Sequence, residues 1–296
     1  MLKIKFLSVF LLVGVFFLNS DTNNAQLNEL KLTSTFGDNR TDHFHTGIDI
    51  AAANNGIVTF HKSEEVVFYS IERPGSIRYG NGEFIITKSE PDHYITNYSH
   101  IQAGSFDRSR LSYKQGEVIG SIGNTGRSTG PHLHIEIYDL KNSQLINPLS
   151  IINFADTSNP VINDVYFIKD NNERVSLIGG GGTVENGGKL FISCYDRIQN
   201  SQYQLTPYSI FFSIDGEEKG GVRLDRLIPQ GSSYSIAGAN ISFDRLYRNG
   251  ANFDYYIGEF YSLPLTRGLK IVVSDYNGNI IEFKRPLRFT VKRSSR

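Results

Sequence analysis

Two histidines separated by a single residue lie between Gly130 and Glu136, in the sequence Gly-Pro-His-Leu-His-Ile-Glu. Alternate side chains of an extended strand share a face, so we expect His132, His134 and Glu136 to point to the same side. Two neighbouring imidazoles are costly to bury without a partner, and this favours a metal ion, a substrate or solvent beside them. Taken alone, the triplet favours a solvated strand face, because such short patterns recur by chance.

A histidine and an aspartate with compatible spacing lie earlier in the chain. His45 precedes Asp49 by four residues, which puts both side chains on one face of a strand, and Gly47 between them is expected to leave room for a ligand. Histidine and aspartate together suit Zn²⁺, whose catalytic sites take three protein ligands and leave one position for water. One histidine of the pair at 132 and 134 would complete such a site.

Short strands must position these residues. Residues from about 30 to 152 contain alternating or apolar runs separated by glycine and asparagine turns, and few apolar residues recur at helical spacing. The fold class is therefore expected to be all-β. The expected strands are Ile57 to Phe60, Glu65 to Ile71, Glu83 to Thr87, Tyr94 to Ser99, Val118 to Ile122 and His132 to Tyr138.

The length of the chain favours two domains. Its 296 residues exceed the usual size of a single domain, and the aromatic content of 12% with 28 glycines is typical of strands and turns. The formal net charge is zero, so no electrostatic attraction of the whole chain to nucleic acid is expected. The basic stretch from Lys284 to Arg296 is interpreted as a solvated end.

Residues 1–25 are predicted to be an export signal peptide. Two lysines precede an apolar run from Phe6 to Leu18, and the small residue Ala25 follows a polar stretch. The run is short for a membrane span and no second apolar segment follows, so no membrane span is expected once the signal is removed. Whether it is removed stays open, because Asn23 is a poor residue before the expected cleavage site.

Several motifs occur in a recognisable order. They are Phe36-Gly37, Arg40, His45-x-Gly-x-Asp49, Tyr79-Gly80-Asn81, Tyr98-Ser-His100, Gly123-Asn-Thr-Gly126, Ser128-Thr-Gly-Pro-His-Leu-His134 and Asn147-Pro148. In this order they resemble the lysostaphin/LytM-type zinc metallopeptidases over residues 32–149. The resemblance implies a catalytic domain at residues 26–154, with a small antiparallel β fold similar to the duplicated hybrid motif. It also implies a groove over the metal and cleavage of peptide bonds in peptidoglycan.

The resemblance further implies a role for each matching residue. His45, Asp49 and His134 match the ligands of one zinc ion per chain. His100 and His132 match the two histidines beside the reacting water, where they would handle its proton and stabilise the oxyanion. Which of these two takes the proton is left open.

Other residues near these motifs have two interpretations. Substrate contacts are expected from Arg40, Asn81 and Thr125, although Arg40 could instead pair with Asp38 or Asp42. Glu136 is expected to orient a zinc-bound or catalytic histidine. A partly exposed strand carboxylate is an equal alternative for Glu136.

A second all-β domain is expected at residues 161–296, after a linker at residues 155–160. Its strand pattern predicts an immunoglobulin-like β-sandwich, with Gly179 to Gly182 as a flexible loop and Cys194 as a buried hydrophobe. The domain is expected to bind the cell wall or an envelope protein, and a purely structural role is an equal alternative. The expected strands include Val161 to Ile168, Lys189 to Tyr195, Tyr208 to Ile214, Phe253 to Tyr261 and Leu269 to Ser274.

The leading hypothesis is an exported zinc endopeptidase of peptidoglycan in the periplasm or cell envelope. One alternative is a non-catalytic relative that binds the cell wall or activates a separate amidase. Another is a secreted adhesin that acts through its C-terminal domain. Catalysis is favoured because non-catalytic relatives are expected to lack metal ligands, whereas all three are present here. The bond that is cut and the oligomeric state stay open.

Overall fold

The computed structural model describes residues 30–52, 56–71, 80–179, 183–185, 187–198, 201–247, 252–261 and 265–290. The expected export signal, the glycines at 180–182 and the chain beyond residue 290 lie outside these ranges. Within them strands dominate, with one short helix, α2 (Phe243–Leu246), and one 3-10 turn, η1 (Pro148–Ser150), which confirms the expected all-β class. No helix in these ranges is long and apolar enough to cross a membrane.

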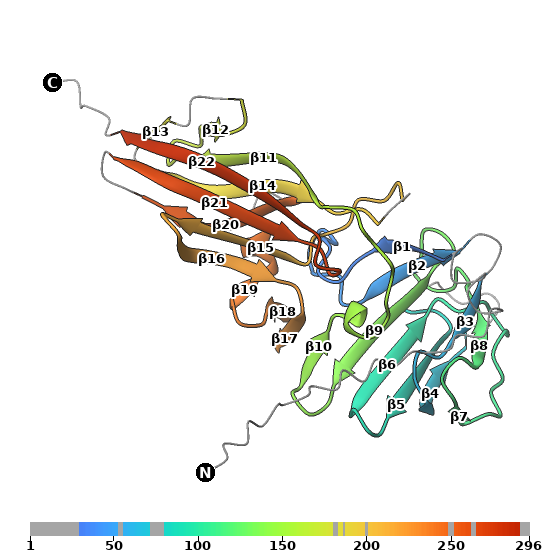
Figure 1. The fold of residues 1–296 in the computed structure, drawn as a ribbon. Coiled ribbons are helices and arrows are strands. Elements are labelled where there is room, and N and C mark those ends of the chain that lie inside the picture. Colours follow the sequence, from blue (N-terminus) through green and yellow to red (C-terminus); the bar gives the residue numbers. More distant parts are fainter. Residues whose placement is uncertain are drawn as a thin grey trace, which may run out of the picture.

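A large, mainly antiparallel sheet holds the first half of the chain (Figure 1). Its central strand β9 (Leu133–Asp139) pairs with β6 (Tyr94–Ser99), β2 (Ile48–Ala52) and β10 (Gln144–Ile146). The sheet continues through β1 (Leu30–Ser34), β5 (Phe84–Ser89), β4 (Glu64–Ser70) and β7 (Ser112–Tyr113). A separate pair, β3 (Ile57–Thr59) and β8 (Val118–Ser121), contributes to the same hydrophobic core.

The strand alternation predicted around His134 is present in β9. Leu133, Ile135 and Ile137 are buried, whereas His134 and Glu136 are only partly buried and share the opposite face. The apolar face packs against residues such as Tyr98 and Ile50, so the core fixes the direction in which His134 points. His132 lies just before β9, where it forms an isolated bridge with Gly123.

Two further sheets form the second half of the chain. One contains β12 (Arg174–Ser176), β11 (Val161–Ile168), β14 (Gly188–Tyr195) and β20 (Asp254–Phe260). The other contains β13 (Thr183–Glu185), β22 (Ile280–Thr290), β21 (Thr266–Ser274), β15 (Ser209–Ile214) and β16 (Glu217–Arg223). Side chains from both sheets share one core, in which Cys194 is fully buried as expected. Most predicted strands agree with the observed ones within two residues.

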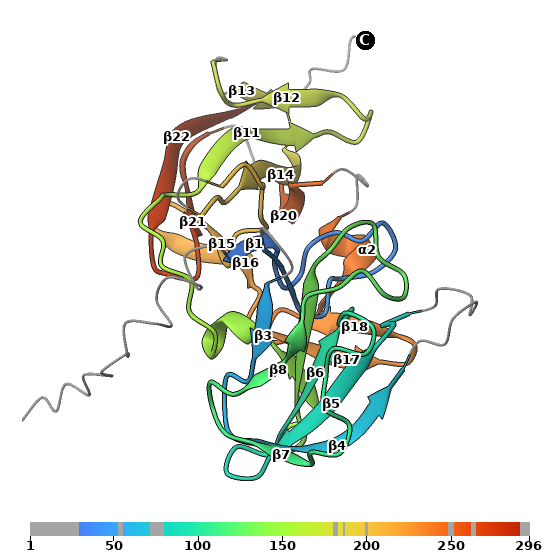
Figure 2. The same ribbon diagram turned by 90° about the vertical axis from the view of Figure 1, so that its right-hand side faces the viewer.

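One part of the second half joins the first sheet, which the sequence did not predict. Strands β17 (Arg226–Gln230), β18 (Ser233–Ile236) and β19 (Ile241–Ser242) extend that sheet beyond β10, through the pair Leu145 and Leu227 (Figures 1 and 2). Helix α2 follows, and Phe243 packs against Phe44 with ring centroids 5.4 Å apart. The hydroxyl of Tyr247 donates to the carbonyl of Gly37 at 2.7 Å. The two halves therefore share a sheet edge and part of a core.

Candidate metal centre and its groove

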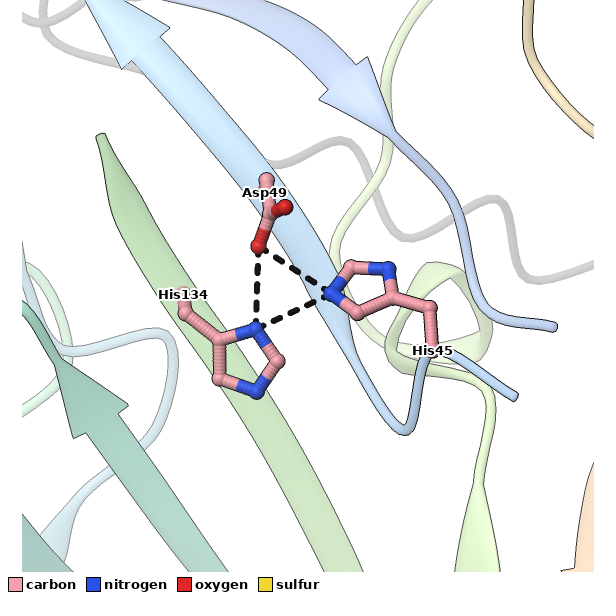
Figure 3. Close-up of side chains that lie close together, drawn as sticks. All are labelled: His45, Asp49 and His134. Atoms are coloured by element: carbon pink, nitrogen blue, oxygen red, sulfur yellow. Dashed lines mark hydrogen bonds and ion pairs between the residues drawn. The ribbon is translucent and has the colours of Figure 1, made fainter. Parts of the chain in front are cut away.

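Three side chains converge where β2 meets β9 (Figure 3). Asp49 and His134 are direct partners in the antiparallel register of these strands. His45 lies before β2, in a loop closed by hydrogen bonds from Gly37 N to His45 O and from His45 N to Asp38 O, each 2.8 Å. The strand register and this loop together bring the predicted ligands to one point.

The three candidate ligand atoms are nearly equidistant. Nε2 of His45 lies 3.1 Å from Oδ1 of Asp49 and 3.1 Å from Nδ1 of His134. The remaining distance, between Nδ1 of His134 and Oδ1 of Asp49, is 2.9 Å. Ligands about 2.0–2.1 Å from a tetrahedral zinc ion lie about 3.3 Å from one another, so this triangle fits zinc with a small expansion.

The hydrogen bonds of His45 fix which ring nitrogen faces the centre. Its Nδ1 lies 2.8 Å from the carbonyl oxygen of Thr35, which can only accept, so Nδ1 carries the proton. Nε2 therefore presents a lone pair to the side chains of Asp49 and His134. Electron-rich atoms that meet in this way are the donor set that a divalent cation requires.

Burial and mutual contacts change the proton affinity of the site. His45 is almost fully buried, and this desolvation lowers its pKa, so the ring stays neutral. Burial also acts to raise the pKa of Asp49, but its close contacts with His134 and His45 outweigh burial and hold that pKa far below its ordinary value. A neutral imidazole beside an ionised carboxylate is the protonation state that metal binding needs.

Gly47 has a different role from the one expected. The sequence suggested that it leaves room for a ligand, but a Cβ at this position would lie 2.2 Å from the carbonyl oxygen of Ile135 and 2.8 Å from Cε1 of His134. The missing side chain therefore lets β2 approach β9 and leaves space for the imidazole of His134. The expectation was wrong because the strand register, which decides what faces Gly47, was unknown.

Two more histidines stand beside the triangle. Nδ1 of His100 donates to the carbonyl of Thr125 at 2.8 Å, and Nδ1 of His132 donates to the carbonyl of Gly130 at 2.9 Å. Their ring centroids are 4.6 Å apart, and Nε2 of His132 lies 3.8 Å from Oδ1 of Asp49. Burial lowers the pKa of His100 to about 4, although its hydrogen bond to Thr125 partly opposes the effect. In the neutral form of each ring, the hydrogen bond of Nδ1 leaves the lone pair on Nε2, where it can accept a proton.

Arg40 contacts the triangle directly. Its Nη2 lies 2.5 Å from Oδ2 of Asp49 and 2.9 Å from the hydroxyl of Ser34. Its acidic partner is thus Asp49 rather than Asp38 or Asp42. This contact leaves Oδ1 of Asp49 for the centre and restricts rotation of the carboxylate.

Thr125 lies beneath the groove instead of on its wall. Its buried hydroxyl accepts from the backbone N of Glu83 and donates to the carbonyl of Ile101, both at 2.9 Å. Its own carbonyl holds His100. These contacts join three loops around that histidine.

An open groove runs over the five site residues. Its walls include Arg40, Asn81, the loop at residues 126–132, Glu136 and Tyr203. Asn81 also accepts a hydrogen bond through its backbone carbonyl from the N–H of His100, at 3.0 Å. Glu136 lies on the wall. Burial raises the pKa of Tyr234, and the charge of Glu136 raises it further. Tyr203 comes from the second half of the chain, and no spacing in the sequence indicated it.

The comparisons with known proteins agree with the motifs. Residues 43–148 match the model of Peptidase family M23, and a second family model matches residues 159–292. The resemblance of the first part to lysostaphin-type peptidases is therefore confirmed, and a different C-terminal domain family follows it.

Two of the similar proteins are named as peptidases. The DD-carboxypeptidase/endopeptidase Mpg of Neisseria meningitidis serogroup B is 38% identical over 111 residues, which are 38% of this chain and 23% of that protein. The peptidoglycan DD-endopeptidase ShyC of Vibrio cholerae is 39% identical over 71 residues, 24% of this chain and 16% of that protein. This chain thus spans less than a quarter of the length of either relative.

One solved structure that matches this chain is the catalytic domain of the antimicrobial peptidase lysostaphin from Staphylococcus simulans. It has 24% sequence identity to this chain and a TM-score of 0.36, and the match covers 43% of this chain and 94% of that domain.

Proposed function

We propose that this protein is an exported zinc endopeptidase that hydrolyses peptide bonds in peptidoglycan within the cell envelope. The observation that carries the proposal is the triangle of His45, Asp49 and His134 with two further histidines at its side, all in one open groove. The M23 match covers this region, and the names of the similar proteins support a peptide of peptidoglycan as the substrate class.

One Zn²⁺ per chain is proposed, held by Nε2 of His45, Oδ1 of Asp49 and Nδ1 of His134. When bound, zinc supplies a Lewis acid that polarises the scissile carbonyl and lowers the pKa of a water to about 7. Thr35 keeps His45 in the required tautomer, and Arg40 holds the carboxylate of Asp49. Such supporting contacts set the orientation and basicity of metal ligands.

His100 and His132 are proposed to act on the reacting groups. Each donates Nδ1–H to a backbone carbonyl, so each Nε2 can accept the proton that the attacking water loses. The imidazolium so formed becomes a donor to the oxyanion of the tetrahedral intermediate and then to the leaving amine. Because the two rings lie side by side, one can hold the proton while the other stabilises charge.

Substrate is proposed to lie along the groove, in contact with Asn81, Glu136 and Tyr203, which line it. Thr125 is proposed to support the groove from below by holding His100, instead of touching substrate. The groove is open, which suits a cross-linked polymer better than a free small peptide.

The C-terminal sheets are proposed to form an immunoglobulin-like sandwich that positions the groove against the envelope. The shared sheet edge at β10 and β17 and the contribution of Tyr203 to the groove support a positioning role. The alternative, a non-catalytic wall-binding or amidase-activating protein, has no specific observation in its favour, because all five site residues are in place.

Digestion of purified peptidoglycan tests the proposal. Zinc-loaded protein and its His45→Ala and His132→Ala variants are incubated with the polymer, and soluble fragments are identified by mass. Release of cross-link-derived peptides by the parent and by neither variant supports the endopeptidase and names the bond. If the parent carries one zinc ion but releases no fragments, the endopeptidase function is refuted and the wall-binding or activator function is supported.

A further inference from the structure

Three aspartates from distant parts of the chain meet where the two halves join. Asp156 lies in the segment before β11, Asp196 directly follows β14, and Asp275 directly follows β21. One carboxylate oxygen of each lies within 4.8 Å of the others. The linker and the ends of two strands, one from each sheet of the sandwich, therefore direct carboxylates at a common point.

The burial of these carboxylates is unusual for charged groups. The exposed fractions are 8% for Asp156, 7% for Asp196 and 2% for Asp275. Oδ1 of Asp196 is inaccessible to solvent and forms no hydrogen bond within the described residues. An ionised carboxylate oxygen that is buried without a partner is unfavourable, and a bound cation would offset that cost.

No basic side chain in the described ranges forms an ion pair with Asp196 or Asp275. Burial, the charge of Asp275 and then that of Asp156 raise the pKa of Asp196 to about 7. Burial is also the largest cause that raises the pKa of Asp275. Hydrogen bonds from N and Nδ2 of Asn279 to Asp275 offset part of the repulsion between the carboxylates, and a bound cation would offset the rest.

The chemistry of the three side chains selects the ion. All donors are carboxylate oxygens, which suit hard cations such as Ca²⁺ rather than zinc. Oxygens bound to one Ca²⁺ at 2.3–2.6 Å can be up to about 5 Å apart, and this matches the observed spread. A cavity of about 20 Å³ on whose wall Asp196 lies has room for roughly one water, which could complete the coordination.

The geometry points to a structural Ca²⁺ site formed by Asp156, Asp196 and Asp275, separate from the zinc centre. The turn after β21 already holds the linker through Asn277 Nδ2, which donates to the carbonyl of Phe154 at 2.9 Å. Asn279 Nδ2 donates to the carbonyl of Asp156 at 3.2 Å. A bound Ca²⁺ joins this linker to the ends of β14 and β21 and fixes the sandwich relative to the catalytic half.

Calcium binding to the full chain tests the site. Zinc-loaded protein is prepared without calcium, and ⁴⁵Ca²⁺ is added in equilibrium dialysis, with zinc content measured in the same samples. The comparison includes Asp196→Asn and Asp156→Asn, with Asp244→Asn as the matched control because Asp244 is exposed in α2. Thermal unfolding is recorded with CaCl₂, with MgCl₂ and without either salt.

One Ca²⁺ per parent chain is expected, with equal binding by Asp244→Asn and at least tenfold weaker binding by both cluster variants. Ca²⁺ should raise the melting temperature of the parent more than Mg²⁺ does, while zinc content stays constant. Absence of Ca²⁺ binding by the parent, or equal binding by the Asp196→Asn variant, overturns the proposal. The proposal is also overturned if Ca²⁺ does not change the melting temperature of the parent while Asp196→Asn has a higher melting temperature. The cluster would then share a proton instead of a metal ion.

Discussion

Replacing Gly47 by alanine should remove the metal centre while the fold persists. The new Cβ would lie 2.2 Å from the carbonyl oxygen of Ile135, and real Cβ contacts do not fall below 3.0 Å, so β2 and β9 must separate by at least about 0.8 Å. Metal ligands tolerate displacements of only about 0.2 Å, so His134 should leave the coordination geometry. We expect zinc affinity to fall at least about 100-fold, with about 1–3 kcal/mol lost from the free energy of unfolding.

The assay is competition for zinc with a chromogenic chelator, together with urea unfolding of the same samples. Gly130→Ala is the matched control, because a Cβ at Gly130 meets open space in the loop that holds His132. This control should keep both zinc affinity and stability. Equal zinc affinity of Gly47→Ala and the parent would refute the role assigned to the close approach of β2 and β9.

Three further predictions concern the side chains of Arg40, Tyr247 and His61. Arg40→Gln should weaken zinc binding about 10-fold, because Asp49 loses the partner that holds its carboxylate. An unchanged zinc affinity together with a raised KM for peptidoglycan would assign Arg40 to substrate binding instead. Tyr247→Phe should lower the free energy of unfolding, measured with urea, by about 1–3 kcal/mol, because the buried carbonyl of Gly37 loses its hydrogen-bond donor. An unchanged free energy of unfolding would contradict this. Burial lowers the pKa of His61 to about 4. The unfolded chain therefore binds more protons between pH 6.5 and 4, and the parent should lose up to about 3 kcal/mol of stability as pH falls through that window. Measured at several pH values, the free energy of unfolding of His61→Asn should fall less steeply with falling pH than that of the parent. The same pH dependence in both proteins would contradict this role of His61.

The resemblance to known peptidases, more than the spacing, indicated which residues meet at the candidate metal centre. Alternation from Leu133 onward placed His134 on the less buried face of its strand. The four-residue spacing was expected to put His45 and Asp49 on one strand, but His45 lies in the loop before β2, and hydrogen bonds of that loop bring it to Asp49. The supporting contacts were not predictable in this way. Thr35 and Arg40 act through loop conformations that no alternation encodes, and the partner of Arg40 was therefore misidentified among nearby aspartates.

Non-local pairing was the main feature that sequence reasoning missed. Strands β17 and β18 are short, most of β17 is exposed, and Pro229 makes that segment a poor strand candidate. Their place in the first sheet depends on Leu227 facing Leu145, which are far apart in the chain. The aspartate cluster escaped notice for the same reason, since only the fold brings Asp156 and Asp275 together.

The most direct test of the account is the rate of peptidoglycan hydrolysis per bound zinc for the parent and His132→Ala. His132 is assigned to proton transfer and not to metal binding, so the variant should keep one zinc ion per chain. Its rate should fall at least about 100-fold, the scale that positioned acid–base groups contribute. A variant that keeps its zinc and its full rate would contradict the proposed division between metal ligands and catalytic histidines.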